Sequence, residues 1–149
     1  MKYLIIALLS LIASQVSGQT KQDTLGIEKA ALDYVEGWAS GDIERVKSAV
    51  SPELAKRRFV NAAPGVTYLQ DMSASLLAVA AMSNQNGVGM KDFTPDDMLV
   101  QEVIIFDIDG TNASAKTWNK KYGFFDYIHL AKSDGKWIIV NVLWDMNSQ

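Results

Sequence analysis

The chain has 149 residues, of which 48% are hydrophobic and 21% charged, and its formal net charge is −3. This length and composition are typical of one globular domain with a single core. The absence of cysteine excludes disulfides, thiol nucleophiles and thiolate metal sites. One histidine, His129, is too few for a histidine-rich metal centre, and the basic doublets Arg57-Arg58 and Lys120-Lys121 cannot neutralise several phosphates. We therefore expect no metal or other cofactor and no nucleic-acid partner.

The first 18 residues have the pattern of an export signal. Lys2 supplies a positive start, Tyr3 to Ile12 form an apolar run, and Val16-Ser17-Gly18 fits a small-residue cleavage site. This run is too short for the roughly 20 residues that span a bilayer, which disfavours a membrane anchor. We predict that residues 1–18 are removed and that residues 19–149 form one domain. The expected location is the periplasm or the exterior of the cell, with no stable membrane insertion after cleavage.

Two helices are predicted after this segment. The first covers residues 23–39, with Asp23 or Thr24 as its cap. Gly41 suits a left-handed helix end, and Asp42 can then cap a second helix over residues 43–50. We favour this capping role of Asp42 over that of a catalytic carboxylate. The apolar stripe of the first helix consists of Ile27, Ala31, Val35 and Trp38.

The next stretch also favours helix. Ser51-Pro52 looks like a cap followed by a first-turn proline, which starts a helical turn over residues 53–58. Ala63-Pro64-Gly65 breaks it, and a third helix is expected over about residues 66–83. Residues 84–97 carry two glycines and a proline and are predicted to form a loop.

From residue 99 the hydrophobic period becomes that of strands. Four runs rich in β-branched and aromatic residues are separated by turn residues, of which Asp134-Gly135 is the strongest hairpin signal. They predict an antiparallel meander, and helices followed by such a sheet indicate an α+β domain. The predicted strands are 99–108, 111–121, 124–132 and 136–144.

A pocket is predicted from the strand register. If each turn is a two-residue hairpin, Leu130 lies opposite Ile139 and Asp126 lies opposite Leu143. Polar residues then gather at one end of the face that the helices cover, where an unpaired polar group costs about 1–3 kcal/mol. Such a cluster needs water or a ligand. The expected ligand-binding residues are Tyr34 and Trp38 on the first helix and Glu102, Thr117, Asn119, Asp126 and Asn141 on the strands.

The opposite sheet face is predicted to be apolar, which is typical of an interface. We expect a homodimer through this face, and we interpret His129 as an interface residue in preference to a catalytic one. A strand bulge would exchange inward and outward residues locally. The residues expected at the dimer surface are Trp118, Tyr127, His129, Val142 and Trp144.

Two long segments resemble a known family. Tyr34 to Phe59 and Asp126 to Trp144 are similar to the putative lumazine-binding branch of the nuclear transport factor 2-like superfamily. The resemblance rests on the helix junction at Gly41-Asp42, the Ser51-Pro52 step and the hairpin at Asp134-Gly135. It implies a cone-shaped α+β fold in which three N-terminal helices pack on a strongly curved antiparallel sheet. It also implies a pocket at the open end and dimerisation through the sheet, as in many members.

Three functions remain open on these grounds. The first is an exported small-molecule-binding protein with its ligand between the first helix and the concave sheet face. The second is a cofactor-independent isomerase or cyclase of the ketosteroid-isomerase type, with Glu102 or Asp126 as base and Tyr34 or Tyr68 as proton donor. The third is a protein-interaction module that uses the outer sheet face.

Overall fold

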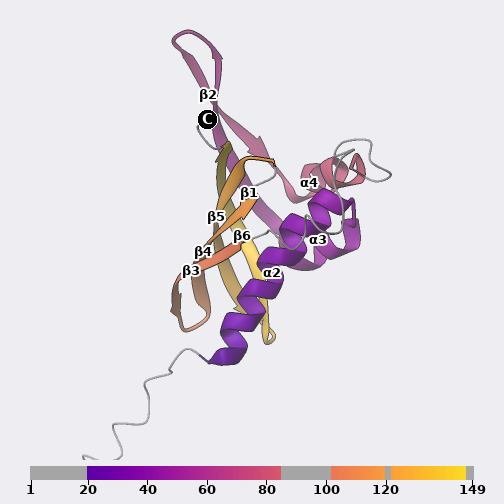
Figure 1. The fold of residues 1–149 in the computed structure, drawn as a ribbon, viewed down its shortest axis with the longest axis vertical. Coiled ribbons are helices and arrows are strands. Elements are labelled where there is room, and N and C mark those ends of the chain that lie inside the picture. The colour runs from indigo at the N-terminus through magenta and orange to yellow at the C-terminus, as the bar shows by residue number, and fades with distance from the viewer. Residues whose placement is uncertain (1–19, 85–101, 120–121, 147–149) are drawn as a thin grey trace, which may run out of the picture.

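The computed structural model describes residues 20–84, 102–119 and 122–146. Its elements, in chain order, are α2 (Lys21–Ser40), α3 (Ile43–Ala49), β1 (Val50–Ala63), β2 (Val66–Met72), α4 (Ala74–Met82), β3 (Glu102–Asp109), β4 (Asn112–Asn119), β5 (Phe124–Ser133) and β6 (Lys136–Met146). The strands form one sheet in the order β2-β1-β6-β5-β4-β3, with the helices on one side of it (Figure 1). The predicted export signal and most of the predicted loop at 84–97 lie outside these residues.

Local capping signals place the first two helices. Thr20, rather than the expected Asp23 or Thr24, caps α2: its side-chain oxygen accepts the Asp23 backbone N–H at 3.1 Å, and its hydroxyl donates back to the Asp23 carboxylate at 2.6 Å. Gly41 ends the helix in the left-handed region with φ 77°. Asp42 caps α3 by accepting the Arg45 N–H at 3.0 Å, so its predicted capping role is confirmed.

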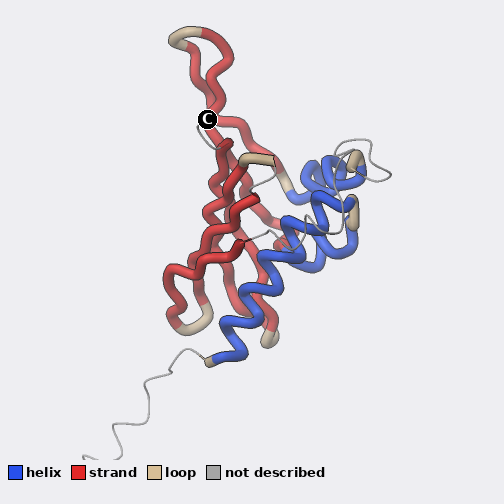
Figure 2. The backbone as a smooth tube through the Cα atoms, in the orientation of Figure 1, coloured by secondary structure: helices blue, strands red, loops and turns tan. Residues whose placement is uncertain are grey.

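The helical predictions for residues 53–58 and for the start of 66–83 are wrong. These residues form the β1–β2 hairpin, which turns at Gly65 with φ 76° and projects from the body of the molecule (Figure 2). The first half of β1 pairs in parallel with β6, which is far away in the sequence. Local helix signals do not reveal such a distant partner. Helix α4 begins only at Ala74, where Ser73 caps it by accepting the Leu76 N–H at 3.2 Å.

The four C-terminal strands are confirmed, with one change of register in β6. The hairpin pairs Leu130 with Ile139 as predicted. Just before Leu130 the register shifts by one residue, so Asp126 pairs with Trp144 instead of Leu143. Because side chains alternate between faces, this bulge exchanges inward and outward residues along the rest of β6.

A second irregularity changes the face of β3. The register shifts between Ile105 and Asp107, so Glu102 pairs with Trp118 instead of Thr117. Directly paired residues share a face, and Trp118 alternates with the buried Thr117. Glu102 therefore lies on the outer face of the sheet.

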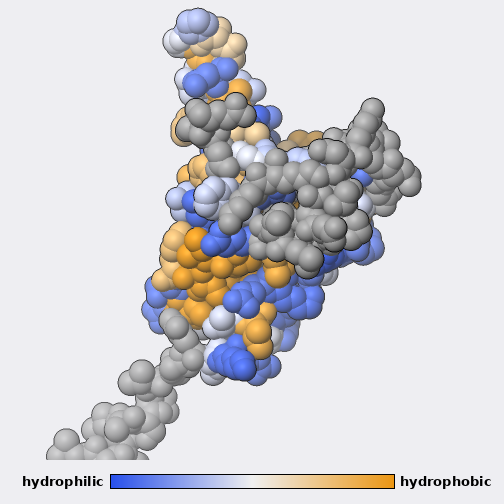
Figure 3. Space-filling view, viewed as in Figure 1, coloured by the Kyte–Doolittle hydropathy of each residue, from blue (hydrophilic) through white to orange (hydrophobic). Residues whose placement is uncertain are grey.

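The core lies between α2 and the concave face of the curved sheet. The architecture is the predicted α+β fold of three helices on one sheet, although the parallel β1–β6 pairing makes the sheet mixed. Among the described residues, no helix is long and apolar enough to cross a membrane. Figure 3 shows hydrophobic surface over β3 and its neighbours, beside α2. The largest fully buried apolar side chains are Ile27, Val46, Leu77, Ile128, Leu130, Ile139 and Val142.

Candidate functional site

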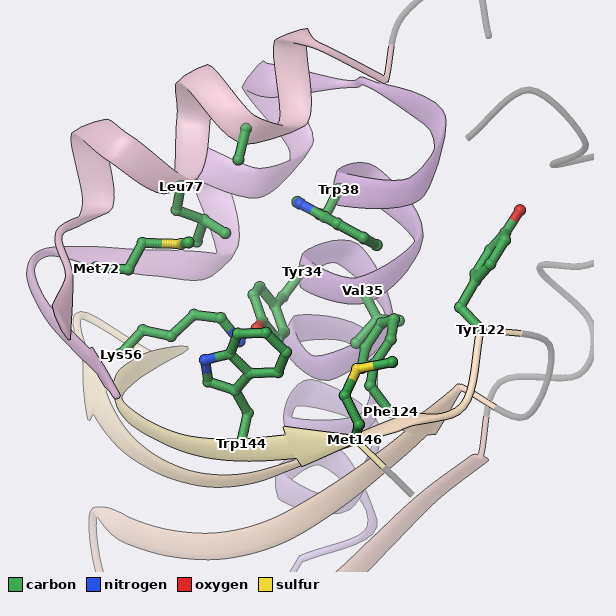
Figure 4. Close-up of a pocket in the computed structure, with 11 residues that line it drawn as sticks. Tyr34, Val35, Trp38, Lys56, Met72, Leu77, Tyr122, Phe124, Trp144 and Met146 are labelled. Atoms are coloured by element: carbon green, nitrogen blue, oxygen red, sulfur yellow. The ribbon is translucent and has the colours of Figure 1, made fainter. Parts of the chain in front are cut away.

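A cavity of about 230 Å³ opens between α2, α4, the middle of β1 and the ends of β2, β5 and β6 (Figure 4). Most of its walls are apolar or aromatic. Trp38 and Phe124 meet edge to face there, with ring centroids 5.5 Å apart. The residues that line it are Tyr34, Val35, Trp38, Lys56, Met72, Leu77, Ala80, Tyr122, Phe124, Trp144 and Met146.

One side of the cavity ends in a buried polar cluster. The Lys56 ammonium donates to the Tyr34 hydroxyl oxygen and to Asp126 Oδ1, both at 2.6 Å. Tyr34 donates to the same carboxylate oxygen at 3.0 Å, and Thr117, which lies directly opposite Asp126 on β4, donates to Oδ2 at 3.2 Å. Lys56 is 6% exposed and Asp126 is fully buried. The cluster is a charge pair held by two hydroxyl groups in a buried part of the protein.

Burial shifts the pKa values of two members of this cluster. It lowers the pKa of Lys56; the negative charge of Asp126 opposes this shift, and the positive charge of Arg58 adds to it. Burial and then the charge of Asp126 raise the pKa of Tyr34 well above 10.0. Tyr34 is consequently a neutral hydroxyl, whereas Lys56 releases its proton more readily than a lysine in water.

Trp144 joins this cluster to a second cation. The Lys56 nitrogen lies 4.5 Å from the Trp144 ring centroid, and the Arg58 guanidinium carbon lies 4.2 Å from it. Arg58 also donates a hydrogen bond to Gln70 Oε1 at 2.7 Å. Two positive charges therefore lie against the Trp144 ring, and the buried carboxylate of Asp126 pairs with one of them, Lys56.

Four of the predicted ligand-binding residues meet at or beside this cavity. Tyr34 and Trp38 line it, and Thr117 and Asp126 belong to the polar cluster behind it. Asn119 is buried as expected, but it does not line the cavity; its side-chain oxygen accepts the backbone N–H of residue 122 at 3.0 Å.

The other two predicted residues, Glu102 and Asn141, lie elsewhere. Both are on the outer face of the sheet, Glu102 because of the register shift in β3 and Asn141 because of the bulge in β6. The Asn141 side chain meets the His129 ring there, with 3.2 Å between Nδ2 and Nδ1. The predicted polar cluster is therefore divided between the two faces of the sheet.

Sequence reasoning missed Lys56 because its segment was interpreted as a helical turn. As a strand, the segment alternates Leu54, Lys56 and Arg58 on one face, and this period was the available signal. The prediction placed Trp144 on the outer face and Asn141 on the inner face, the reverse of the structure, because nothing local marks the bulge.

The aromatic residues on the outer sheet face are not the same set as the predicted ones. Phe106 stacks on Tyr127 at 6.0 Å, and both side chains are about half exposed. The Lys116 nitrogen lies within 5.4 Å of the ring centroids of Trp118 and Tyr127. Trp118, Tyr127 and His129 are placed as predicted, whereas Val142 and Trp144 face inward because of the bulge, which corrects that part of the prediction.

Within the described parts of the chain, no group of three or more histidine, aspartate or glutamate side chains is placed to hold a metal ion. A search among curated proteins gave no significant match. A sequence profile of the family described as "Putative lumazine-binding" matches residues 22–145.

Solved structures agree with that match at the level of the fold. An NTF2-like protein of unknown function from Shewanella baltica is 20% identical and superposes with a TM-score of 0.63, covering 89% of this chain and 100% of the other. One from Silicibacter pomeroyi is 15% identical, with a TM-score of 0.64 and coverage of 87% and 100%. One from Methylobacillus flagellatus is 22% identical, with a TM-score of 0.59 and coverage of 88% and 97%. The chain belongs to the family described as putative lumazine-binding, and it has the fold of the NTF2-like proteins.

Proposed function

We propose that this protein binds a small, flat, mostly apolar molecule that carries one hydrogen-bond acceptor. The observation that carries the proposal is the buried ammonium of Lys56 in the wall of an otherwise apolar cavity. An ammonium has three donors, and two of them are taken by Tyr34 and Asp126. The third has no hydrogen-bond partner among the described residues, and beside the Trp144 ring it can donate to an acceptor on a ligand.

The size and walls of the cavity narrow the ligand class. A volume of about 230 Å³ lies below the 300–1,000 Å³ that is typical of pockets for drug-sized ligands, and it suits one or two fused rings. Trp38, Phe124 and Trp144 offer ring faces and edges for stacking. Lumazine, the fused two-ring heterocycle in the name of the family, has this size and flat shape, but its two carbonyl and two N–H groups make it more polar than the proposed class.

The isomerase or cyclase alternative is less well supported by the geometry. Glu102, one of its two candidate bases, lies on the outer face of the sheet. Asp126, the other, already accepts hydrogen bonds from Lys56, Tyr34 and Thr117. Asp126 also does not line the cavity, so it does not reach a carbon-bound proton of a ligand there.

Binding can be tested by titrating the purified protein with lumazine and a panel of one- and two-ring aromatic compounds, with tryptophan fluorescence and calorimetry as readouts. Ala80→Leu places a larger side chain in the cavity wall and should weaken binding about tenfold or more, which corresponds to about 1.4 kcal/mol. Ala78→Leu is the matched control, because Ala78 lies on the same helix but does not line the cavity. The proposal fails if no compound binds, or if both variants bind like the wild type.

We also propose that the protein is exported and that the chain is cut after residue 18. The support is the sequence pattern of Lys2, the apolar run that follows it and the small residues before the cut. Expression in a Gram-negative host should yield a periplasmic protein whose intact mass begins at Gln19. An uncut chain in the cytoplasmic fraction would contradict this.

A homodimer through the outer sheet face is our proposal for assembly. It is supported by the exposed Phe106 and Tyr127, which stack on each other, and by exposed Leu143 on β6. Grouped apolar side chains of this kind on a sheet face are typical of an interface. The third alternative, an interaction module for another protein, would use the same face.

A further inference from the structure

We propose that Lys56 is a nucleophile whose amine forms an imine with small aromatic aldehydes or ketones in the cavity. The inference rests on the proposed binding function and names a reactive class of ligand for the same site. Figure 4 shows the Lys56 side chain running from β1 past Met72 to end beside Tyr34 and Trp144.

Lys56 differs from the other lysines in its surroundings. Among the described lysines it alone is buried, with 8% of its side chain exposed, compared with 57% for Lys47 and 74% for Lys29. A lysine in an apolar pocket beside another cation is the arrangement in which a free amine becomes accessible near neutral pH. Here the pocket is the cavity, and the second cation is Arg58, which faces the same Trp144 ring.

The electrostatic setting supports this chemistry. Burial lowers the pKa of Lys56, and each unit of such a shift raises the fraction of free amine at neutral pH about tenfold. The Asp126 carboxylate opposes the shift by stabilising the ammonium. The same carboxylate is, however, 2.6 Å from the nitrogen, so it can accept the proton that the amine must lose before it attacks.

The reaction balances with the groups present. The Lys56 ammonium gives a proton to Asp126, and the free amine then attacks the carbonyl carbon, forming a C–N bond while the C=O π electrons move to oxygen. The Tyr34 hydroxyl, 2.6 Å from the nitrogen, passes a proton from nitrogen to that oxygen, which gives a neutral carbinolamine. Asp126 returns its proton to the departing hydroxyl, which leaves as water. The net change converts the ammonium and the carbonyl compound into an iminium ion and one water, and Asp126 is again the counter-ion.

Trapping with a hydride donor tests the inference on the wild-type protein itself. The protein is incubated with 2-naphthaldehyde and sodium cyanoborohydride at pH 7, and the adducts are located by intact mass and peptide mapping. We expect a single early adduct on Lys56, forming about ten times faster or more than the adduct on the exposed Lys47. Equal or slower labelling of Lys56 in the folded protein would overturn the inference, and this comparison needs no variant.

Variants separate a specific reaction from simple accessibility. Lys56→Met should lose the early adduct, and Ala80→Leu should slow it because the cavity is partly filled. Lys116→Met is the matched control, since Lys116 also lies beside aromatic rings but on the outer face, and it should leave the Lys56 adduct unchanged. If Lys116→Met abolishes the early adduct, the assignment to Lys56 is refuted.

The same experiment distinguishes the inference from the binding function on which it rests. If 2-naphthaldehyde quenches tryptophan fluorescence reversibly, but hydride traps no adduct on Lys56, the imine is refuted and the binding function stands. If neither 2-naphthaldehyde nor its unreactive analogue 2-naphthamide binds, both fail. Slower trapping in Asp126→Asn, with 2-naphthamide affinity retained, would support the proton-accepting role of Asp126.

Discussion

The pairing of Lys56 with Asp126 makes a quantitative prediction about stability. We consider a double-mutant cycle of Lys56→Met and Asp126→Asn, which removes each charge while keeping the side chains close in size. Each single substitution leaves one buried charge without its partner, because the two groups are 2.6 Å apart and almost fully enclosed. Breaking a buried pair in this way lowers the free energy of unfolding by about 3–5 kcal/mol.

The double variant should be far less damaged than the sum of the two singles. With both charges gone, no buried ion remains, and the substituted amide still has an oxygen that can accept the Tyr34 hydroxyl. Replacing a whole buried pair by groups of similar volume is often neutral, so the double variant should lie within about 1–3 kcal/mol of the wild type. The coupling energy between the two positions is then about 3 kcal/mol or more.

Urea unfolding followed by tryptophan fluorescence measures all four corners of the cycle, because Trp137 is buried and reports on the core. Each single variant is expected to lose a large part of a typical domain stability of about 5–15 kcal/mol. Circular dichroism, followed through thermal unfolding from a low starting temperature, should therefore be used to check that each variant is folded. Additive losses, with a coupling energy below about 0.5 kcal/mol, would refute the reasoning, since independent sites add to within that error.

Three further predictions concern pH, packing and assembly. The pKa of Lys56 in the folded protein lies below 10.5, so between that pKa and 10.5 the unfolded chain binds more protons than the folded one. In urea titrations, the stability of the wild type relative to Lys56→Met should therefore increase as the pH rises from 7 to 10. A stability difference that does not change with pH would contradict this. Gly26→Ala should lower stability by about 1 kcal/mol despite the better helix propensity, because a Cβ there would lie 2.7 Å from Trp137 Cδ1; a more stable variant would show that the indole can move. Phe106→Lys should give a monomer in sedimentation experiments, whereas Leu25→Lys on α2 should leave the dimer intact; a dimer in both would exclude the outer sheet face as the interface.

The features that sequence could predict are those with local causes. Gly41 and Asp42 end one helix and begin the next through contacts within a few residues, and the structure has both. Asp134 and Gly135 both adopt positive φ, as a tight hairpin between two strands requires, and the hairpin is where it was expected. The same logic explains why the strands on either side of this turn were found.

The features that sequence missed depend on distant partners. Strand β1 exists because it pairs in parallel with β6, and the Lys56–Asp126 contact joins positions 70 residues apart. A proline after a serine is a fair helix signal locally, and the pairing with β6 overrides it. A lysine in a solvated turn and a lysine in a buried pair look alike until the carboxylate that faces it is known.

The bulge in β6 connects the missed register to the chemistry of the cavity. Leu130 pairs with Ile139 and His129 with Asn141, so Val140 is the extra residue of β6 at this point. In a regular strand, Asn141 would face the helices together with Leu143, and the wall beside Asp126 would carry an amide. With the extra residue, the Asn141 side chain points outward and contacts His129. The next inward residues are Val142, which lies beside Lys56, and Trp144, whose indole faces the Lys56 ammonium. One inserted residue therefore makes the surroundings of Lys56 apolar and aromatic, which is the condition under which burial lowers its pKa and the cavity can hold a flat ligand against it.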